Sequence, residues 1–257
     1  MQFTVENIEF YLLILVRISA FVFTAPIFSA TSIPRPVQAG ISGFLTIVVA
    51  STIDYSPLTY NTVYEMAGLI ILELLTGLII GFFANICIHI INFAGHMIDT
   101  EIGFSMASIF DPASSMQVTI SASLFSYFVM LLMLVSGLHH YLIRAIIETF
   151  QIIPIGGAKL APDFYLVMLQ FITDMFIIGF RIILPVFASI LVVNVVLAIL
   201  AKVSPQMNMF VVGFQLKILI GLIMFLVLAT LLPGIGSFIF DEIRLMVQTV
   251  VARLSGA

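Results

Sequence analysis

The sequence contains no tryptophan and a single cysteine, Cys87, so no intrachain disulfide can form. Charged residues are equally scarce: Asp, Glu, Lys and Arg make up 9% of the chain, whereas an average soluble domain has about 25%. Lys and Arg together number 9 and form no basic run, which argues against a nucleic-acid partner. Walker, GxSxG, HExxH and CxxC patterns are also missing. The sequence therefore suggests no enzyme class, no cofactor and no metal centre.

The residues that are present are mostly apolar. Hydrophobic residues make up 62% of the 257 positions, and the mean hydropathy is +1.25, as is typical of an integral membrane protein. The pattern predicts an all-α membrane-type protein with six to seven hydrophobic helices, some of them broken or kinked. The predicted hydrophobic runs cover 8–28, 37–53, 63–95, 118–138, 164–201 and 209–232, with an amphipathic helix and a turn in 139–162.

Prolines interrupt the last two runs. Pro185 lies near the middle of 164–201, so this run predicts either two short helices or one long kinked helix. The motif PGIG at 233–236 predicts the end of the final span, followed by an amphipathic tail that carries Arg244 and Arg253.

The third run carries a polar stripe. Polar and small residues follow one another there in steps of four or three and share an arc of about 160° on a helix. Three interpretations are open: packing within the chain, contact with neighbouring subunits or an aqueous passage, and a metal or proton site. The spacing favours the first two over the third. The stripe consists of Glu73, Gly77, Gly81, Asn85, His89, Asn92, His96, Asp99 and Gly103.

Other polar residues stand alone in apolar surroundings and need partners, because an unpaired charge in lipid costs several kcal/mol. Arg17 with Glu73 is one candidate pair. Asp174 and Arg181 are separated by about 10 Å along one helix, so each must find a partner elsewhere. Lys217 has the alternative of extending to the membrane surface. The expected subunit-interface or buried polar positions are Arg17, Glu73, Gly77, Gly81, Asn85, Asp99, Asp174, Arg181, Asn194, Gln206, Asn208 and Lys217.

Several short blocks follow in a fixed order along nearly the whole chain. They are RISA at 17–20, API at 25–27, SIP at 32–34, Glu73 with Gly77 and GF at 81–82, AG at 94–95, GFSMA at 103–107, DPAS at 111–114, TF at 149–150, IPIGG at 153–157, LP at 184–185, Asn194, PQM at 205–207 and FVVGF at 210–214. In this order and spacing the chain resembles the FliR/SctT family of type III export-gate proteins. The intact IPIGG block favours the flagellar branch.

The resemblance implies a structural subunit and not an enzyme. Such a subunit assembles with FliP and FliQ into a closed helical channel that exports unfolded flagellar proteins, with FlhB around its cytoplasmic mouth and FlhA and the basal-body ring nearby. The implied location is the bacterial inner membrane at the flagellar basal body, with much of the assembly above the membrane plane. Residues 1–163 would form a FliP-like part, and residues 164–257 a FliQ-like helical hairpin with a C-terminal tail.

The resemblance also implies a channel plug. The stretch GFSMASIFDPASSMQ at 103–117 reads as a loop by its Gly, Ser and Asp-Pro content, and it aligns with the family's plug. The implied plug residues are Gly103, Phe104, Ser105, Met106, Phe110, Asp111, Pro112 and Met116. The alternative function is an ion-coupled secondary transporter, which intramembrane charges and broken helices would suit. No inverted repeat between the two halves of the sequence favours that alternative.

Overall fold

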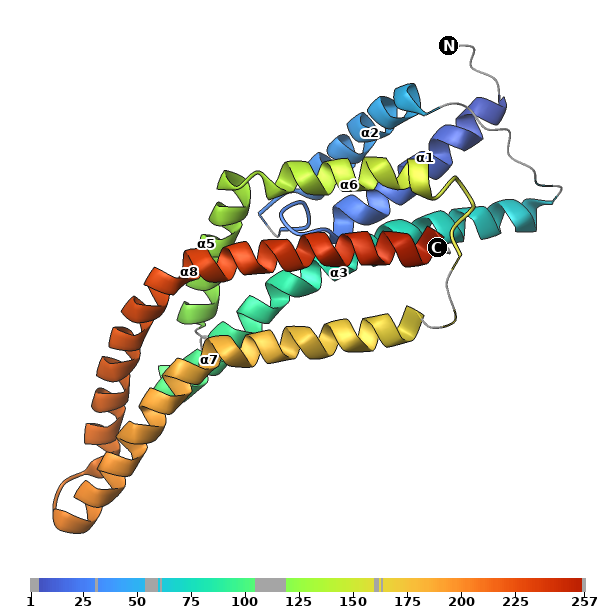
Figure 1. The fold of residues 1–257 in the computed structure, drawn as a ribbon. Coiled ribbons are helices and arrows are strands. Elements are labelled where there is room, and N and C mark those ends of the chain that lie inside the picture. Colours follow the sequence, from blue (N-terminus) through green and yellow to red (C-terminus); the bar gives the residue numbers. More distant parts are fainter. Residues whose placement is uncertain are drawn as a thin grey trace. The chain divides into compact units, whose positions relative to one another are not determined.

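The computed structural model describes residues 5–30, 32–53, 60, 62–104, 119–159, 162 and 164–255. This part of the chain is all-helical, as the sequence predicted, and forms seven α-helices (Figure 1). The helices are α1 (Val5–Thr24), α2 (Arg35–Thr52), α3 (Val63–Ile102), α5 (Ile120–Val135), α6 (Leu138–Ile152), α7 (Phe164–Val203) and α8 (Met209–Ser255).

The helices α7 and α8 run through their internal prolines. Of the two alternatives for 164–201, one long helix is correct, because α7 continues through Pro185 for 40 residues. The helix break expected at Pro233 does not occur, because α8 continues through this proline and is 47 residues long. A proline removes one helical hydrogen bond. The apolar helix-forming sequence on both sides supplies many more, so the local break signal is overridden.

Three helices, α3, α7 and α8, are long and apolar enough to cross a membrane. The pair α5 and α6 adds a fourth candidate if it crosses as one span, although the two helices meet at a bend of 68°. The runs 8–28 and 37–53 form helices α1 and α2, as predicted, but neither is among the candidate spans found within the described residues. Membrane crossing by these two runs stays a prediction.

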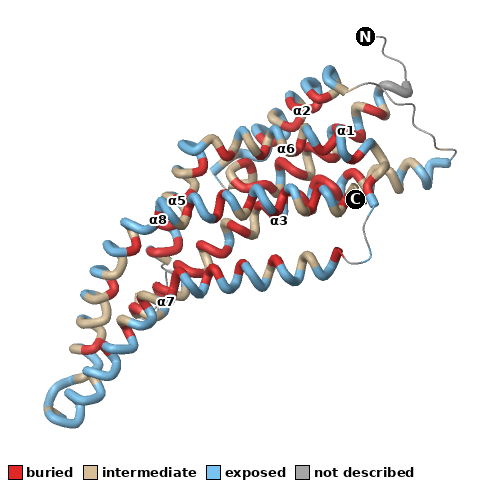
Figure 2. The backbone as a smooth tube through the Cα atoms, viewed as in Figure 1, coloured by how far each residue is buried: buried red, intermediate tan, exposed pale blue. Residues whose placement is uncertain are grey.

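The chain divides into two compact units, each assembled from separate sequence segments. The first comprises Met1–Cys87, Leu134–Phe171 and Phe240–Ala257, and the second comprises Ile88–Met133 and Ile172–Ile239. In the first unit α1 packs against α2. Its core includes Leu13, Ile14, Ile18, Phe21, Leu142, Ile146, Ile243 and Leu254, none of which is exposed to solvent. Figure 2 shows such buried residues recurring along one face of a helix, with exposed residues between them, as expected for amphipathic packing.

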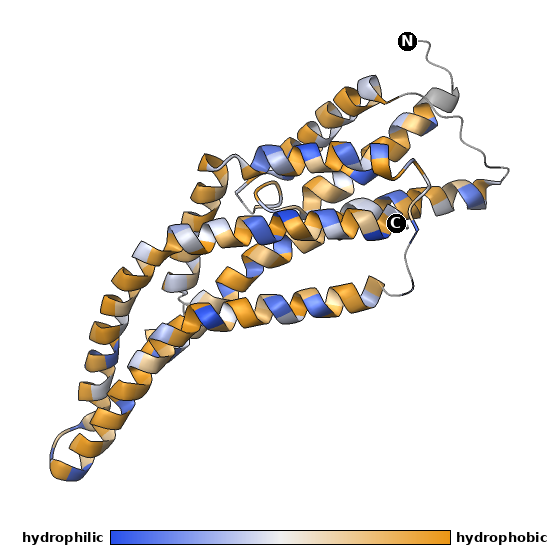
Figure 3. Cartoon of the chain, in the orientation of Figure 1, coloured by the Kyte–Doolittle hydropathy of each residue, from blue (hydrophilic) through white to orange (hydrophobic). Residues whose placement is uncertain are grey.

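Aromatic contacts connect the helices of the second unit. Phe93 on α3 makes edge-to-face contacts with Phe176 and Phe180 on α7, with ring centroids 5.5 and 5.9 Å apart. Phe125 on α5 stacks on Phe225 of α8 at 5.0 Å. In this unit α7 and α8 are joined by a polar turn at 204–208 and form a hairpin, which Figure 3 shows as predominantly hydrophobic with few hydrophilic positions. The hairpin therefore presents a long apolar surface.

Candidate functional site

The first unit contains a fully buried ion pair between α1 and α3. Arg17 Nη2 donates a hydrogen bond to Glu73 Oε1 at 2.9 Å, and Arg17 Nε donates to Glu73 Oε2 at 2.5 Å. Both side chains have no exposed surface. This two-pronged geometry is the strong form of the arginine–carboxylate interaction. The structure thus forms the pair that the sequence offered as one candidate.

A turn after α6 completes the hydrogen bonding of this pair. We call residues 153–157 the IPIGG turn; it is closed by the Gly157 amide, which donates to Pro154 O at 2.9 Å. Arg17 Nη1 donates to Ile153 O at 3.0 Å, and the Gly156 amide donates to Glu73 Oε1 at 2.7 Å. Three segments that lie far apart in the sequence therefore meet at one pair of charges.

The geometry explains why this turn contains glycine. Gly156 has a φ of +74°, a conformation that L side chains rarely adopt. A Cβ atom at this position would lie 2.5 Å from Leu69 Cδ2. The guanidinium of Arg17 also lies 4.2 Å from the centre of the Phe150 ring, a cation–π arrangement. The sequence predicts a turn here, but it does not predict the contact of the IPIGG turn with the ion pair, because neither glycine carries a side chain that suggests one.

Close helix packing accounts for two glycines of the polar stripe. A Cβ atom on Gly77 would lie 2.1 Å from the backbone oxygen of Arg17, and one on Gly81 would lie 2.1 Å from Thr24 Oγ1. The backbones of α3 and α1 approach closely here, as small residues allow in membrane-type helix pairs. For Glu73, Gly77 and Gly81, the structure therefore shows packing within the chain, the first of the three interpretations.

In the second unit the stripe meets the start of α5. Asp99 is 3% exposed. Both of its carboxylate oxygens accept a hydrogen bond from the backbone amide of Ser121, at 3.0 and 3.1 Å. A carboxylate is favoured at this end of a helix, where amides lack internal acceptors. Nearby, Ser126 donates to the side-chain oxygen of Asn92. The stripe thus joins the end of α3 to α5.

Three other stripe residues are not fully covered by this chain. Asn85 is half-buried, and His89 and His96 are exposed. Coverage of the whole face by protein stays a prediction for these positions. As for the third interpretation, no group of three His, Cys, Asp or Glu side chains suited to a metal ion occurs within the described ranges.

The polar residues of the hairpin lie on its surface. Asp174, Arg181, Asn194, Gln206 and Asn208 are exposed, and Lys217 is half-buried. The five exposed side chains are not covered by this chain, because they face outward from α7 and the following turn. A subunit interface stays a prediction for all six.

Two predicted plug residues can be placed. Gly103, with a φ of +97°, follows the end of α3, and its backbone faces the Phe214 ring, which a Cβ atom would meet at 3.7 Å. Phe104 comes next and is half-buried. The other predicted plug residues lie outside the described residues; they are Ser105, Met106, Phe110, Asp111, Pro112 and Met116.

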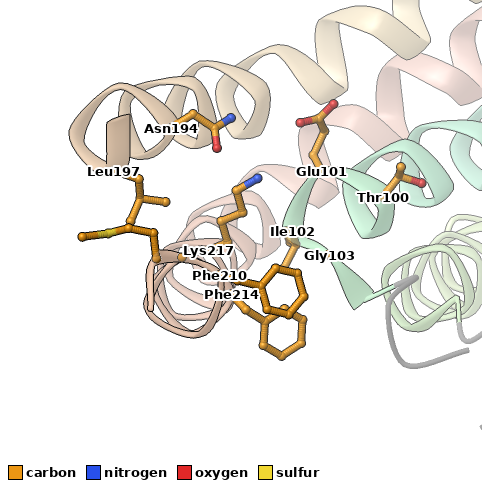
Figure 4. Close-up of a pocket in the computed structure, with 11 residues that line it drawn as sticks. Thr100, Glu101, Ile102, Gly103, Asn194, Leu197, Phe210, Phe214 and Lys217 are labelled. Atoms are coloured by element: carbon orange, nitrogen blue, oxygen red, sulfur yellow. The ribbon is translucent and has the colours of Figure 1, made fainter. Parts of the chain in front are cut away.

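Beside Gly103 the second unit contains a cavity of about 270 Å³. Glu101 from α3, Asn194 from α7 and Lys217 from α8 supply its polar lining, and Phe210 and Phe214 supply apolar surface (Figure 4). Asn194 and Lys217 are among the predicted interface or buried polar positions, whereas Glu101, which lies off the stripe, was not predicted. The cavity gathers charges of both signs next to the predicted plug.

The chain is similar to known proteins over most of its length. The family model described as bacterial export proteins, family 1, matches residues 8–243. The flagellar biosynthetic protein FliR of Bacillus subtilis is 36% identical over 223 residues, which cover 84% of this chain and 85% of that protein. The chain belongs to the FliR family of bacterial export proteins. The matched residues 8–243 include parts of both units.

Two further FliR proteins are similar to this chain over most of its length. FliR of Escherichia coli is 28% identical over 240 residues, covering 93% of this chain and 92% of that protein. FliR of Aquifex aeolicus is 30% identical over 213 residues, covering 82% of this chain and 81% of that protein. These relatives are all flagellar proteins, in agreement with the branch that the IPIGG block favoured.

Proposed function

We propose that this chain is a structural subunit of the flagellar type III protein export gate. In this role it helps to form and close the channel through which unfolded flagellar proteins cross the inner membrane. The observation that carries the proposal is the match of the family model to residues 8–243, together with the similarity to FliR proteins over 84–93% of the chain. In this role the chain is structural and acts through its contacts with other subunits of the gate.

The first unit supports a scaffold role. The charges of Arg17 and Glu73 neutralise each other in a fully buried site. The IPIGG turn accepts a hydrogen bond from Arg17 and donates one to Glu73. A buried charge that is already paired is a poor carrier for a transported ion, because moving it would expose its partner. The pair therefore suits a rigid connection between α1, α3 and the turn after α6 better than it suits the transporter alternative.

The hairpin of the second unit supports contact with other subunits. Large apolar side chains are exposed along α7 and α8, including Leu184, Val192, Phe210 and Leu226. Polar residues such as Asp174 and Asn194 are exposed on the same hairpin. Lipid alone would penalise these polar side chains, whereas neighbouring protein accepts both kinds of surface.

The proposed partners are those of a flagellar export gate. FliP and FliQ form the core of the gate with this chain, FlhB lies at the cytoplasmic mouth, and FlhA and the basal-body ring surround them. Residues 1–163 take a FliP-like place and residues 164–257 a FliQ-like place, with the α7–α8 hairpin as the FliQ-like element. The assembly sits at the inner membrane in the flagellar basal body, with much of it above the membrane plane.

The proposal also assigns residues 103–117 as the plug that closes the resting channel. Its support comes from the described residues on both sides. Gly103 lies against Phe214, and the Ser121 amide is bound by Asp99. These contacts hold the two ends of the segment near one another, whatever the segment itself does.

Co-expression tests the proposed function. The full chain, carrying an affinity tag, is produced with and without FliP and FliQ of the same organism, and the mass of the purified assembly is measured. A gate subunit gives one large complex that contains all three proteins and is poorly stable when produced alone. Purification of the chain as a stable monomer or small symmetric oligomer, without FliP or FliQ when they are present, contradicts the proposal and favours the transporter.

A further inference from the structure

The last turn of α3 rests on α8 within the second unit. Ile102, the final residue of α3, is 1% exposed. A Cβ atom on Gly221 of α8 would lie 2.6 Å from Ile102 Cγ1 and 2.7 Å from both Cδ1 and Cγ2. The side chain of Ile102 therefore fills the space that a side chain at position 221 would occupy.

Ile102 cannot leave this space by rotating its side chain. Isoleucine is branched at Cβ, so its χ1 angle is restricted. Both of its γ carbons face Gly221, and each of the other staggered χ1 positions still turns one of them toward α8. The contact therefore holds the backbone of the last turn of α3 and not only one side chain.

The surroundings of this contact show what it controls. Gly103 follows Ile102 with a φ of +97° and faces the ring of Phe214, which also lies on α8. Beside the same turn lies the cavity of about 270 Å³, bordered by Glu101 and Lys217 (Figure 4). This space gives the last turn of α3 room to shift if the contact between Ile102 and α8 is lost.

We propose that Ile102 and Gly221 are positioning residues for the plug. Their contact fixes the point at which the chain leaves α3 at Gly103. It does so from α8, the helix whose exposed apolar side chains are proposed to contact neighbouring subunits. Closure of the resting channel therefore depends on a contact outside the plug itself. This inference rests on the proposed function, because it takes residues 103–117 as the plug.

Two other glycines of α8 separate this role from ordinary helix packing. A Cβ atom on Gly213 would meet only Leu197 of α7 within 4 Å, at 3.1 Å. A Cβ atom on Gly234 would have no neighbour within 4 Å. Alanine at position 213 therefore perturbs the hairpin without touching α3, and alanine at position 234 changes only the local helix propensity. Both substitutions are matched controls for Gly221→Ala.

The test uses the full chain in its complex with FliP and FliQ. Gly221→Ala inserts a methyl group into the space of Ile102. Ile102→Ala removes the contact from the side of α3 without overpacking, and it replaces Gly221→Ala if that variant does not assemble. Ile102→Ala combined with Gly221→Val returns the same number of side-chain carbons to the contact. The measured quantities are the passage of small ions through the resting complex, hydrogen exchange of the backbone amides 101–103, and the mass of the complex.

The expected result is a leak from an intact complex. Gly221→Ala and Ile102→Ala each raise the passage of small ions and the exchange rate of amides 101–103 by about tenfold or more, as overpacking or loss of one buried apolar contact does to a local equilibrium. The mass of the complex stays the same. The combined variant restores most of the closed state, and Gly213→Ala and Gly234→Ala match the unaltered protein.

Deletion of residues 106–114 in the same complex distinguishes the possible failures. If the deletion variant leaks while Gly221→Ala and Ile102→Ala stay closed, this proposal is overturned and the plug assignment stands. Faster exchange at 101–103 without a leak has the same meaning, because the contact is then packing alone. An equal leak in Gly213→Ala also overturns the proposal, since any disturbance of the hairpin then opens the channel. A deletion variant that does not leak overturns the plug assignment and, with it, this inference.

Discussion

Arg17 and Glu73, which are 56 positions apart in the chain, form an ion pair with no solvent-exposed surface, and the IPIGG turn hydrogen-bonds to both of them. The pair joins α1 to α3, and the turn adds the segment that follows α6. A buried ion pair contributes little net stability by itself. Its consequence is specificity, because any packing that separates these three segments leaves a charge unpaired in the core.

Breaking this pair from one side should be severe. Glu73→Gln leaves the Arg17 guanidinium buried without a counter-charge, and we expect a loss of about 3–5 kcal/mol in the stability of the first unit. The measurement is thermal unfolding of the purified chain or complex in detergent. Asp241→Asn is the control, since Asp241 pairs with Arg244 at 3.4 Å on the surface, where such pairs have little effect. Similar melting temperatures for the two variants would show that the buried pair does not hold the unit together.

Two glycines of α3 should respond to alanine in opposite directions. Gly77→Ala places a Cβ atom 2.1 Å from a backbone oxygen of α1, so the helices must separate, at a cost of about 1–3 kcal/mol. Gly68→Ala on the same helix meets nothing within 4 Å, so it should stabilise the helix by up to about 1 kcal/mol. Thermal unfolding of both variants checks this. A Gly77→Ala protein as stable as the Gly68→Ala protein would show that α1 and α3 are not in close contact.

Asp99 should control the order of the start of α5. Asp99→Ala removes the acceptor of the buried Ser121 amide, and an unsatisfied buried donor costs about 1–3 kcal/mol. Hydrogen exchange of the backbone around 120–123 should therefore become about tenfold faster or more. Thr100→Ala, at the neighbouring exposed position, is the control and should leave this exchange unchanged. Equal exchange in both variants would mean that the carboxylate does not hold the helix start.

If the proposed plug closes the resting channel, its removal should let small ions leak through the channel. Deletion of residues 106–114 should raise the passage of small ions across the inner membrane while the chain still assembles with FliP and FliQ. Conductance of cells or of reconstituted complexes measures the effect. An assembled deletion variant with the conductance of the unaltered protein would show that this segment is an ordinary connection between α3 and α5.

The sequence alone was sufficient for the helices and for the family, because long apolar runs specify helices in any membrane-type protein and short blocks in order specify a relationship. It was not sufficient where distant segments meet. Arg17 had several candidate partners, and only packing brought Glu73 and the Gly156 amide to it. The proline at position 233 predicted a helix end from local sequence alone, but the helical residues on both sides of it keep α8 continuous. His89 and Gly81 share one helix face, yet Gly81 is buried and His89 is exposed. Helical periodicity gives a residue's direction from its own axis, whereas the neighbouring helix that covers it comes from elsewhere in the chain.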